Sequence, residues 1–110
     1  MLRLEKTKIN ATEILSLYGE VDASNSVILD EAIQEIIAAG CKSLLIDGKN
    51  LEYISSAGLG VFMSYLEDFQ DQGISMKICE LVPRVFEVFR ILGLDQLIPI
   101  YPDREAAFAA

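Results

Sequence analysis

Histidine is absent from this 110-residue chain, and cysteine occurs only twice, as Cys41 and Cys79. Without histidine, the Ser-His and Cys-His pairs that most often activate a nucleophile cannot form. The two cysteines stand too far apart in sequence to act as a chelating pair, which argues against a zinc site. We therefore expect two reduced, partly buried thiols and no bound metal, the usual state of cysteine in a cytoplasmic protein.

Membrane segments and an excess of basic residues are also lacking. The longest apolar runs are too short and too interrupted to span a bilayer, and Met1–Glu5 precede no apolar stretch with a cleavage site. The formal net charge of −8 argues against unaided binding to nucleic acid or to anionic lipid. An acidic surface instead favours basic partners, protein partners included.

The composition is that of a folded globule, because apolar residues make up 52% of the chain and charged residues 24%. A chain of this length forms one domain of common size. There is no internal repeat, linker or low-complexity segment, so residues 1–110 are expected to form a single domain.

Two extended segments open the chain. Leu2–Ile9 and Glu13–Tyr18 show the loose alternation of strands, with Asn10 as the turn residue between them. Such a short connection implies an antiparallel hairpin. Gly19–Asp22 are then expected to break the second strand.

After this hairpin, helical and extended patterns alternate. The middle helical segment carries one apolar stripe, formed by Leu59, Phe62, Met63, Leu66 and Phe69. Asp47–Asn50 is a turn by composition, and a terminal helix is expected after Asp103, with Phe108 as its one large anchor. The short strands expected between the helices are Ser43–Ile46, Ile74–Cys79 and Leu97–Tyr101.

This order of elements predicts the fold class. Strands that alternate with helices of roughly ten to sixteen residues imply parallel crossovers, to which the hairpin adds an antiparallel pair. Each helix is apolar on one stripe only, so it covers the sheet with that stripe. We predict an α/β domain with a mixed sheet of about four or five strands and helices covering one face.

Three acidic residues, Glu20, Asp22 and Asp47, fall where strands are expected to end. Functional groups in open α/β sheets collect beyond the carboxyl ends of the strands. Beside a helix-capping serine, these carboxylates could bind Mg²⁺ or flank a phosphorylation site. Alternatively, Asp22 and Asp47 are turn and capping residues with solvated side chains.

The segment Ser55–Gly60 lies at the expected junction between an extended and a helical segment. Capping of the helix is by itself a sufficient reason for Ser55 at the N-cap and Ser56 at the first helical position. Gly58 and Gly60 are harder to explain, since each costs about 1 kcal/mol relative to alanine inside a helix. Glycines there allow another backbone, or a partner protein, to approach closely. The segment therefore marks a contact surface.

The sequence Tyr-Ile-Ser-Ser-Ala-Gly-Leu-Gly-Val at 53–61 resembles the signature of STAS domains, specifically that of the bacterial anti-sigma factor antagonists. The resemblance extends over essentially the whole chain, in the family's order of elements. The other segments that resemble this family are Gly19–Asp22, Leu45–Asp47 followed by Leu51, and Val85-Phe86 with Leu92-Gly93-Leu94.

The usual signature of this family is Asp-Ser-Ser/Thr/Ala-Gly-Leu-Gly, and its first serine is phosphorylated by a partner anti-sigma factor. That serine corresponds to Ser56, whereas Ser55 stands where the family has an aspartate. The resemblance implies partner switching that regulates transcription. Unphosphorylated protein binds an anti-sigma factor that is also an ATP-dependent serine kinase, phosphorylation of Ser56 ends the binding, and a PP2C-type phosphatase restores it. ATP and Mg²⁺ belong to the kinase, so this chain is a substrate and ligand without a cofactor, and not an enzyme.

Two alternatives stay open. One is a constitutive interaction subunit, such as a scaffold in a signalling complex or a soluble component of a transport system. The other is a small hydrolase or phosphotransferase that uses Ser56, which the lack of histidine disfavours. The expected partner-binding residues are Glu20, Asp22, Asp47, Ser55, Ser56, Ala57, Gly58 and Gly60.

Overall fold

Five strands form one mixed sheet, in which they follow one another in sequence order from β1 to β5. In the computed structural model, which describes every residue of the chain, β1 (Leu2–Ile9) and β2 (Thr12–Val21) pair antiparallel. Each of β3 (Ser43–Ile54), β4 (Ser75–Cys79) and β5 (Ile100–Tyr101) runs parallel to the strand before it. The predicted mixed α/β sheet is confirmed.

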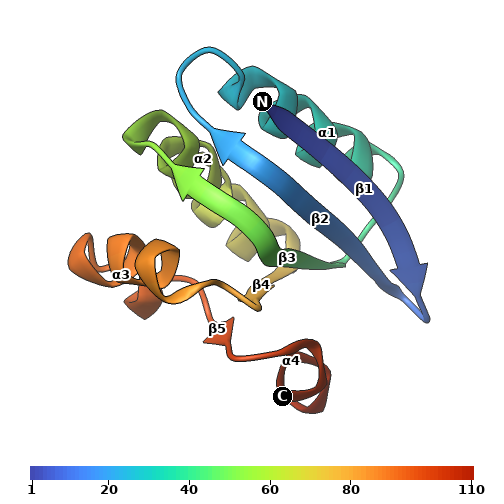
Figure 1. The fold of residues 1–110 in the computed structure, drawn as a ribbon. Coiled ribbons are helices and arrows are strands. Elements are labelled where there is room, and N and C mark those ends of the chain that lie inside the picture. The colour runs from blue at the N-terminus through green and yellow to red at the C-terminus, as the bar shows by residue number, and fades with distance from the viewer.

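Three helices connect the parallel strands: α1 (Ser26–Ala38), α2 (Ser56–Gln72) and α3 (Pro83–Ile91). Because the crossovers all step in the same direction along the sheet, right-handed connections place the three helices on one face. Figure 1 shows α1 and α2 side by side behind the strands. Their apolar stripes and the strands enclose the main core of 21 buried residues. None of the helices is both long and apolar enough to cross a membrane.

The terminal helix α4 (Arg104–Ala109) lies on the opposite face of the sheet, where Ala107 packs with Ile14, Leu45 and Cys79. The helices are therefore not confined to one face. Asp103 caps α4 as predicted, since its side chain accepts a hydrogen bond from the N–H of Ala106.

Two predicted core residues are exposed instead. Phe108 was expected to anchor α4, but it is 42% exposed because α4 turns its small residue Ala107 toward the sheet. Met63 was placed in the apolar stripe of α2, but it is 50% exposed. Leu59 and Phe62 on the same helix are buried as predicted.

The prediction of a turn at Asp47–Asn50 is wrong, because β3 runs through this segment without a break. Between its pairings with Ser16 and Tyr18 of β2, β3 has one residue more than β2. This extra residue forms a β-bulge, which bends a strand and increases its twist without ending it. Leu51 to Ile54 therefore belong to the same strand as Ser43–Ile46.

A second extra residue lies just after Leu51. In a regular strand, residues five or three positions apart point to opposite faces. Ile46, Leu51 and Ile54 are separated by these intervals, yet all three lie in the core beneath the helices. The two bulges make this possible, because each one switches the faces of the residues that follow.

Two strand boundaries also differ from the expectation. Gly19–Val21 continue β2 rather than breaking it, because their backbone pairs with the second half of β3. The last strand is shortened to Ile100–Tyr101, because Leu94–Gln96 form a 3₁₀ turn before it.

Both cysteines are free, as expected, but they differ in access to solvent. Cys79 is fully buried beneath α4, whereas Cys41 is half-buried. Burial, followed by the nearby Asp47 carboxylate, raises the pKa of the Cys79 thiol to about 12. Cys79 therefore stays protonated at any ordinary pH.

We predict that a thiol reagent at about pH 8 modifies one cysteine of the native chain quickly, because the thiolate is the reactive form. The second thiol should react only when urea unfolds the protein. The number of modified thiols with and without urea measures this. Equal reaction rates for both thiols in the native protein would contradict the placement of α4 over Cys79.

Candidate functional site

The serine turn, defined as Ser55 to Gly60, joins the end of β3 to the start of α2. Ser55 has an extended backbone and is the N-cap, and its Oγ accepts a hydrogen bond of 3.3 Å from the N–H of Gly58. Its own N–H donates to the carbonyl oxygen of Val21 at 2.9 Å. These two bonds fix the turn to the end of β2 as well as to the helix.

The two serines consequently differ in availability. The Ser55 hydroxyl satisfies a backbone N–H of the first helical turn, which is the ordinary task of an N-cap residue. Ser56 is the first residue of α2, and it is exposed. An oxygen at that position lies in the positive field of the helix N-terminus, which favours a negatively charged group.

Glu20 and Asp22 flank Val21, so both lie beside the serine turn as predicted. Asp22 organises the loop that leads into α1, because its Oδ1 accepts hydrogen bonds from the hydroxyl and the N–H of Ser24. These bonds hold the pKa of the Asp22 carboxyl below its ordinary value. Asp22 therefore has a structural role in this loop, whereas the exposed side chain of Glu20 has no such role.

Asp47 lies away from this group. It sits in the middle of β3 on the face covered by α4, is only 7% exposed, and forms an ion pair of 2.7 Å with Arg104. The expectation that Asp47 ends a strand and joins Glu20 and Asp22 is wrong, because the strand continues past it. No group of three or more carboxylate and thiol side chains is arranged to hold a metal ion.

Gly58 and Gly60 have different surroundings. A Cβ atom added to Gly58 would lie 2.7 Å from Cγ1 of both Ile54 and Val21, so the core itself requires glycine there. A Cβ atom added to Gly60 would meet nothing within 4 Å. Gly60 is exposed and its conformation is helical, so the fold gives no reason for a glycine.

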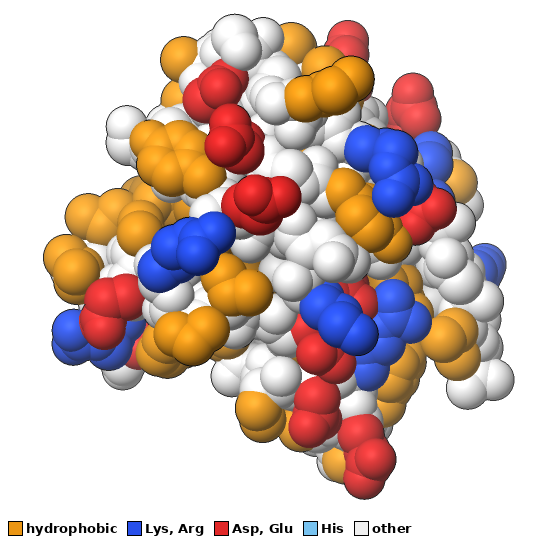
Figure 2. All heavy atoms as spheres, viewed as in Figure 1, with side chains coloured by type: hydrophobic (Ala, Val, Ile, Leu, Met, Phe, Trp, Pro, Cys, Tyr) orange, Lys and Arg blue, Asp and Glu red, His pale blue; other side chains and the backbone are white.

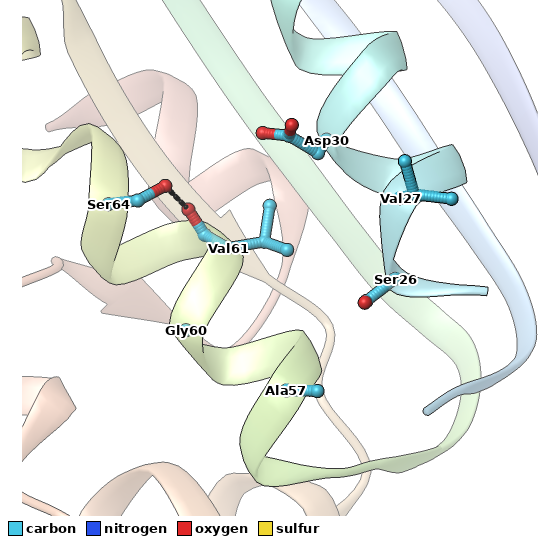
Figure 3. Close-up of a pocket in the computed structure, with 7 residues that line it drawn as sticks. All are labelled: Ser26, Val27, Asp30, Ala57, Gly60, Val61 and Ser64. Carbon is cyan, nitrogen blue, oxygen red and sulfur yellow. Dashed lines mark hydrogen bonds between the residues drawn. The ribbon is translucent and has the colours of Figure 1, made fainter. Parts of the chain in front are cut away.

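A shallow groove of about 340 Å³ runs between the first turns of α1 and α2, beside the serine turn. Figure 3 shows Ser26 and Asp30 of α1 across the groove from Ala57, Gly60 and Val61 of α2. Ala57, Gly60 and Ser64, three of the four lining residues of α2, are small.

Val27 of α1, which lines the groove, is an exposed apolar side chain. The same three elements carry other exposed apolar side chains: Tyr53 near the end of β3, Met63 on α2 and Ile28 on α1. Figure 2 shows acidic side chains gathered where β2 and β3 end. The sequence pattern did not single out Val27 or Ile28 and placed Met63 in a buried stripe, because helical spacing cannot tell a buried position from one at the edge of a stripe. A surface that combines exposed apolar side chains with acidic ones suits docking of a protein.

Comparisons with known proteins agree with this geometry. The STAS domain family model matches residues 3–107. BtrV of Bordetella bronchiseptica is 34% identical over 109 residues, which cover 99% of this chain and 94% of BtrV. An anti-sigma F factor antagonist of Paenibacillus polymyxa is 31% identical over 104 residues, covering 91% of this chain and 86% of that protein.

Solved structures show the same fold. An anti-sigma factor antagonist from Mycobacterium paratuberculosis superimposes with a TM-score of 0.90 at 22% identity, over 99% of this chain and 92% of that one. The phosphorylated form of the Bacillus protein SpoIIAA gives a TM-score of 0.71 at 19% identity, over 99% of this chain and 98% of SpoIIAA. The chain belongs to the STAS domain family, among the anti-sigma factor antagonists.

Proposed function

We propose that this protein binds an anti-sigma factor that is also a serine kinase, and that phosphorylation of Ser56 ends the binding. The observation that carries the proposal is the exposed Ser56 at the first position of α2, beside a groove that the fold leaves open. In this role the chain acts in the cytoplasm as a regulator of transcription. It is the substrate of the kinase and the ligand of the anti-sigma factor, and not an enzyme.

The geometry favours Ser56 over Ser55 as the acceptor. A kinase needs a hydroxyl that can leave its own hydrogen bonds and reach the γ-phosphate. Ser55 would give up the cap of α2 on modification, at a cost of about 1 kcal/mol. Ser56 is exposed and its modification leaves that cap in place.

The charge of a phosphate explains how modification would act as a switch. A phosphoserine carries nearly two negative charges at neutral pH, and the helix N-terminus of α2 accommodates them within the chain. Glu20 and Asp22 already make this edge acidic. An anti-sigma factor docked here would have to bury the phosphate against its own surface. Changing occupancy from 99:1 to 1:99 takes about 5.5 kcal/mol, which burial of an unpaired dianion can supply.

The proposed docking surface keeps most of the predicted partner-binding residues. Asp47 and Gly58 are left out, because both are buried within the chain. The groove adds residues of α1, among them the exposed Val27. The residues retained from the sequence-based prediction are Glu20, Asp22, Ser55, Ser56, Ala57 and Gly60.

The relatives support this proposal in two ways. Anti-sigma factor antagonist is the name of the Paenibacillus relative, so an anti-sigma factor is the natural partner. SpoIIAA, which shares the fold, is known in a phosphorylated form. A PP2C-type phosphatase would complete the cycle by removing the phosphate from Ser56.

We predict that Ser56→Ala binds the anti-sigma factor as tightly as the unmodified protein but is not released when ATP is added. Ser56→Asp should bind about tenfold more weakly or worse, because a charge that faces an acidic or apolar interface is costly. Ser55→Ala tests the assignment to Ser56: it loses the cap of α2 but should still be released when ATP is added, because the acceptor hydroxyl remains. Titration calorimetry measures all three, and equal affinities of Ser56→Ala and Ser56→Asp would refute the switch.

Intact-protein mass spectrometry separates this function from that of a constitutive scaffold. Protein isolated from cells that contain the cognate kinase should carry a phosphate, which peptide mapping places on Ser56. A scaffold subunit would carry none under the same conditions.

We predict opposite effects of alanine at the two glycines of the serine turn. Gly60→Ala should stabilise the fold by up to about 1 kcal/mol, because alanine is the better helix former, and weaken binding of the partner. Gly58→Ala should destabilise the fold by about 1–3 kcal/mol, because its methyl group overpacks the core against Ile54 and Val21. Urea unfolding and calorimetry measure both. Unchanged partner affinity in Gly60→Ala would remove Gly60 from the docking surface.

A further inference from the structure

We propose that Asp47 is a positioning residue for the serine turn, which it holds in place from the opposite face of the sheet through the first β-bulge of β3. Arg104 of α4 holds the Asp47 carboxylate in the orientation that this requires. The effect on phosphorylation rests on the proposed function, but the effect on the shape of the turn does not.

Each oxygen of the Asp47 carboxylate has a separate partner. Oδ1 accepts a hydrogen bond of 2.9 Å from the N–H of Lys49, which lies inside the bulge. Oδ2 accepts one of 2.7 Å from Nε of Arg104. The Asp47 side chain is only 9% exposed, so both bonds are partly shielded from water and each is stronger than it would be at the surface.

The bulge that Asp47 closes also determines where the strand ends. Its one extra residue turns Leu51 into the core, and from there the strand continues to Ile54 and Ser55. The N–H of Ser55 then meets the carbonyl oxygen of Val21. A different bulge would shift these residues along β2 and break that bond.

Gly48 shows that the bulge is closely packed. It is buried, and a Cβ atom there would lie 2.4 Å from Cδ2 of Leu81 and 3.7 Å from the carbonyl oxygen of Cys79. The segment after β4 therefore lies directly over the bulge. Glu80 in this segment has a positive φ of 64°, which is unusual for a residue other than glycine.

Both the backbone and the side chain of Arg104 are held by hydrogen bonds. Its backbone N–H donates to Oε2 of Glu80 at 3.1 Å, and its guanidinium reaches Asp47. A separate bond fixes the other end of α4, where Nζ of Lys77 donates to the carbonyl oxygen of Ala107 at 3.1 Å. Lys77 thus fastens α4 to the sheet without any contact with the bulge.

Arg104→Met tests the proposal in the full-length, unphosphorylated chain, with Lys77→Met as the matched control. Each variant removes two side-chain hydrogen bonds that fasten α4, those of Arg104 to Asp47 and Ser16 or those of Lys77 to the carbonyl oxygens of Ala107 and Ala110. Only Arg104→Met leaves the Asp47 carboxylate without its charged partner. We expect Arg104→Met to speed hydrogen exchange of the Lys49 and Ser55 amides about tenfold, and to shift the amide resonances of Ser56 and Gly58. Lys77→Met should leave these four amides unchanged.

Asp47→Asn provides a second variant that buries no unpaired charge. Its amide oxygen still accepts from the N–H of Lys49, so it should shift the same amides in the same direction but less far. Shifts confined to α4 and its contacts in Arg104→Met would overturn the proposal. Equal shifts of the serine turn in Arg104→Met and Lys77→Met would also overturn it, because the cause would then be the docking of α4.

Phosphorylation kinetics supply the functional readout. With the cognate kinase, Arg104→Met should lower kcat/KM for Ser56 while Lys77→Met leaves it unchanged. If the kinase does not phosphorylate the chain without substitutions, the proposed function is refuted. The amide measurements then still decide the role of Asp47. A changed turn with unchanged kcat/KM would show that Asp47 does not position Ser56 for the kinase.

Discussion

The pairing of β2 with β3 is the constraint on which the serine turn depends. Ile46, Leu51 and Ile54 must all face the helices to complete the core, although their spacing of five and then three residues is wrong for a regular strand. Two bulges resolve this conflict. They also bring Ser55 to the carbonyl oxygen of Val21, where α2 begins. The position of the proposed phosphate acceptor is thus a consequence of how the core is filled.

Periodicity identified the helices and most of the sheet, since apolar spacing depends on local geometry alone. It failed at Asp47–Asn50, because Asp, Gly and Asn are typical of turns and serve equally well in a bulge. The odd interval between Ile46 and Leu51 was the clue that favoured a bulge. Because a turn was expected, Asp47 was placed at a strand end, whereas it is buried opposite Arg104.

The site was predicted in outline and corrected in detail. Ser55 as the cap and Ser56 as the first helical residue follow from local chemistry, so the sequence was sufficient. The difference between Gly58 and Gly60 depends on how Gly58 packs against Ile54 and against Val21 of β2, and the sequence could not predict this packing. The groove beside α1 also arises only when the helices pack. Membership of the STAS family shows the fold and places the chain among anti-sigma factor antagonists. The contacts within this chain show which residues remain available to a partner.

In the proposed switch, one phosphate on Ser56 decides whether the anti-sigma factor binds. This switch is tested most directly by measuring the affinity of one preparation for that factor before and after the kinase has modified Ser56 to completion. Phosphorylation is expected to weaken binding about ten-thousandfold, since a full exchange of occupancy from 99:1 to 1:99 needs about 5.5 kcal/mol. Equal affinities before and after modification would contradict it.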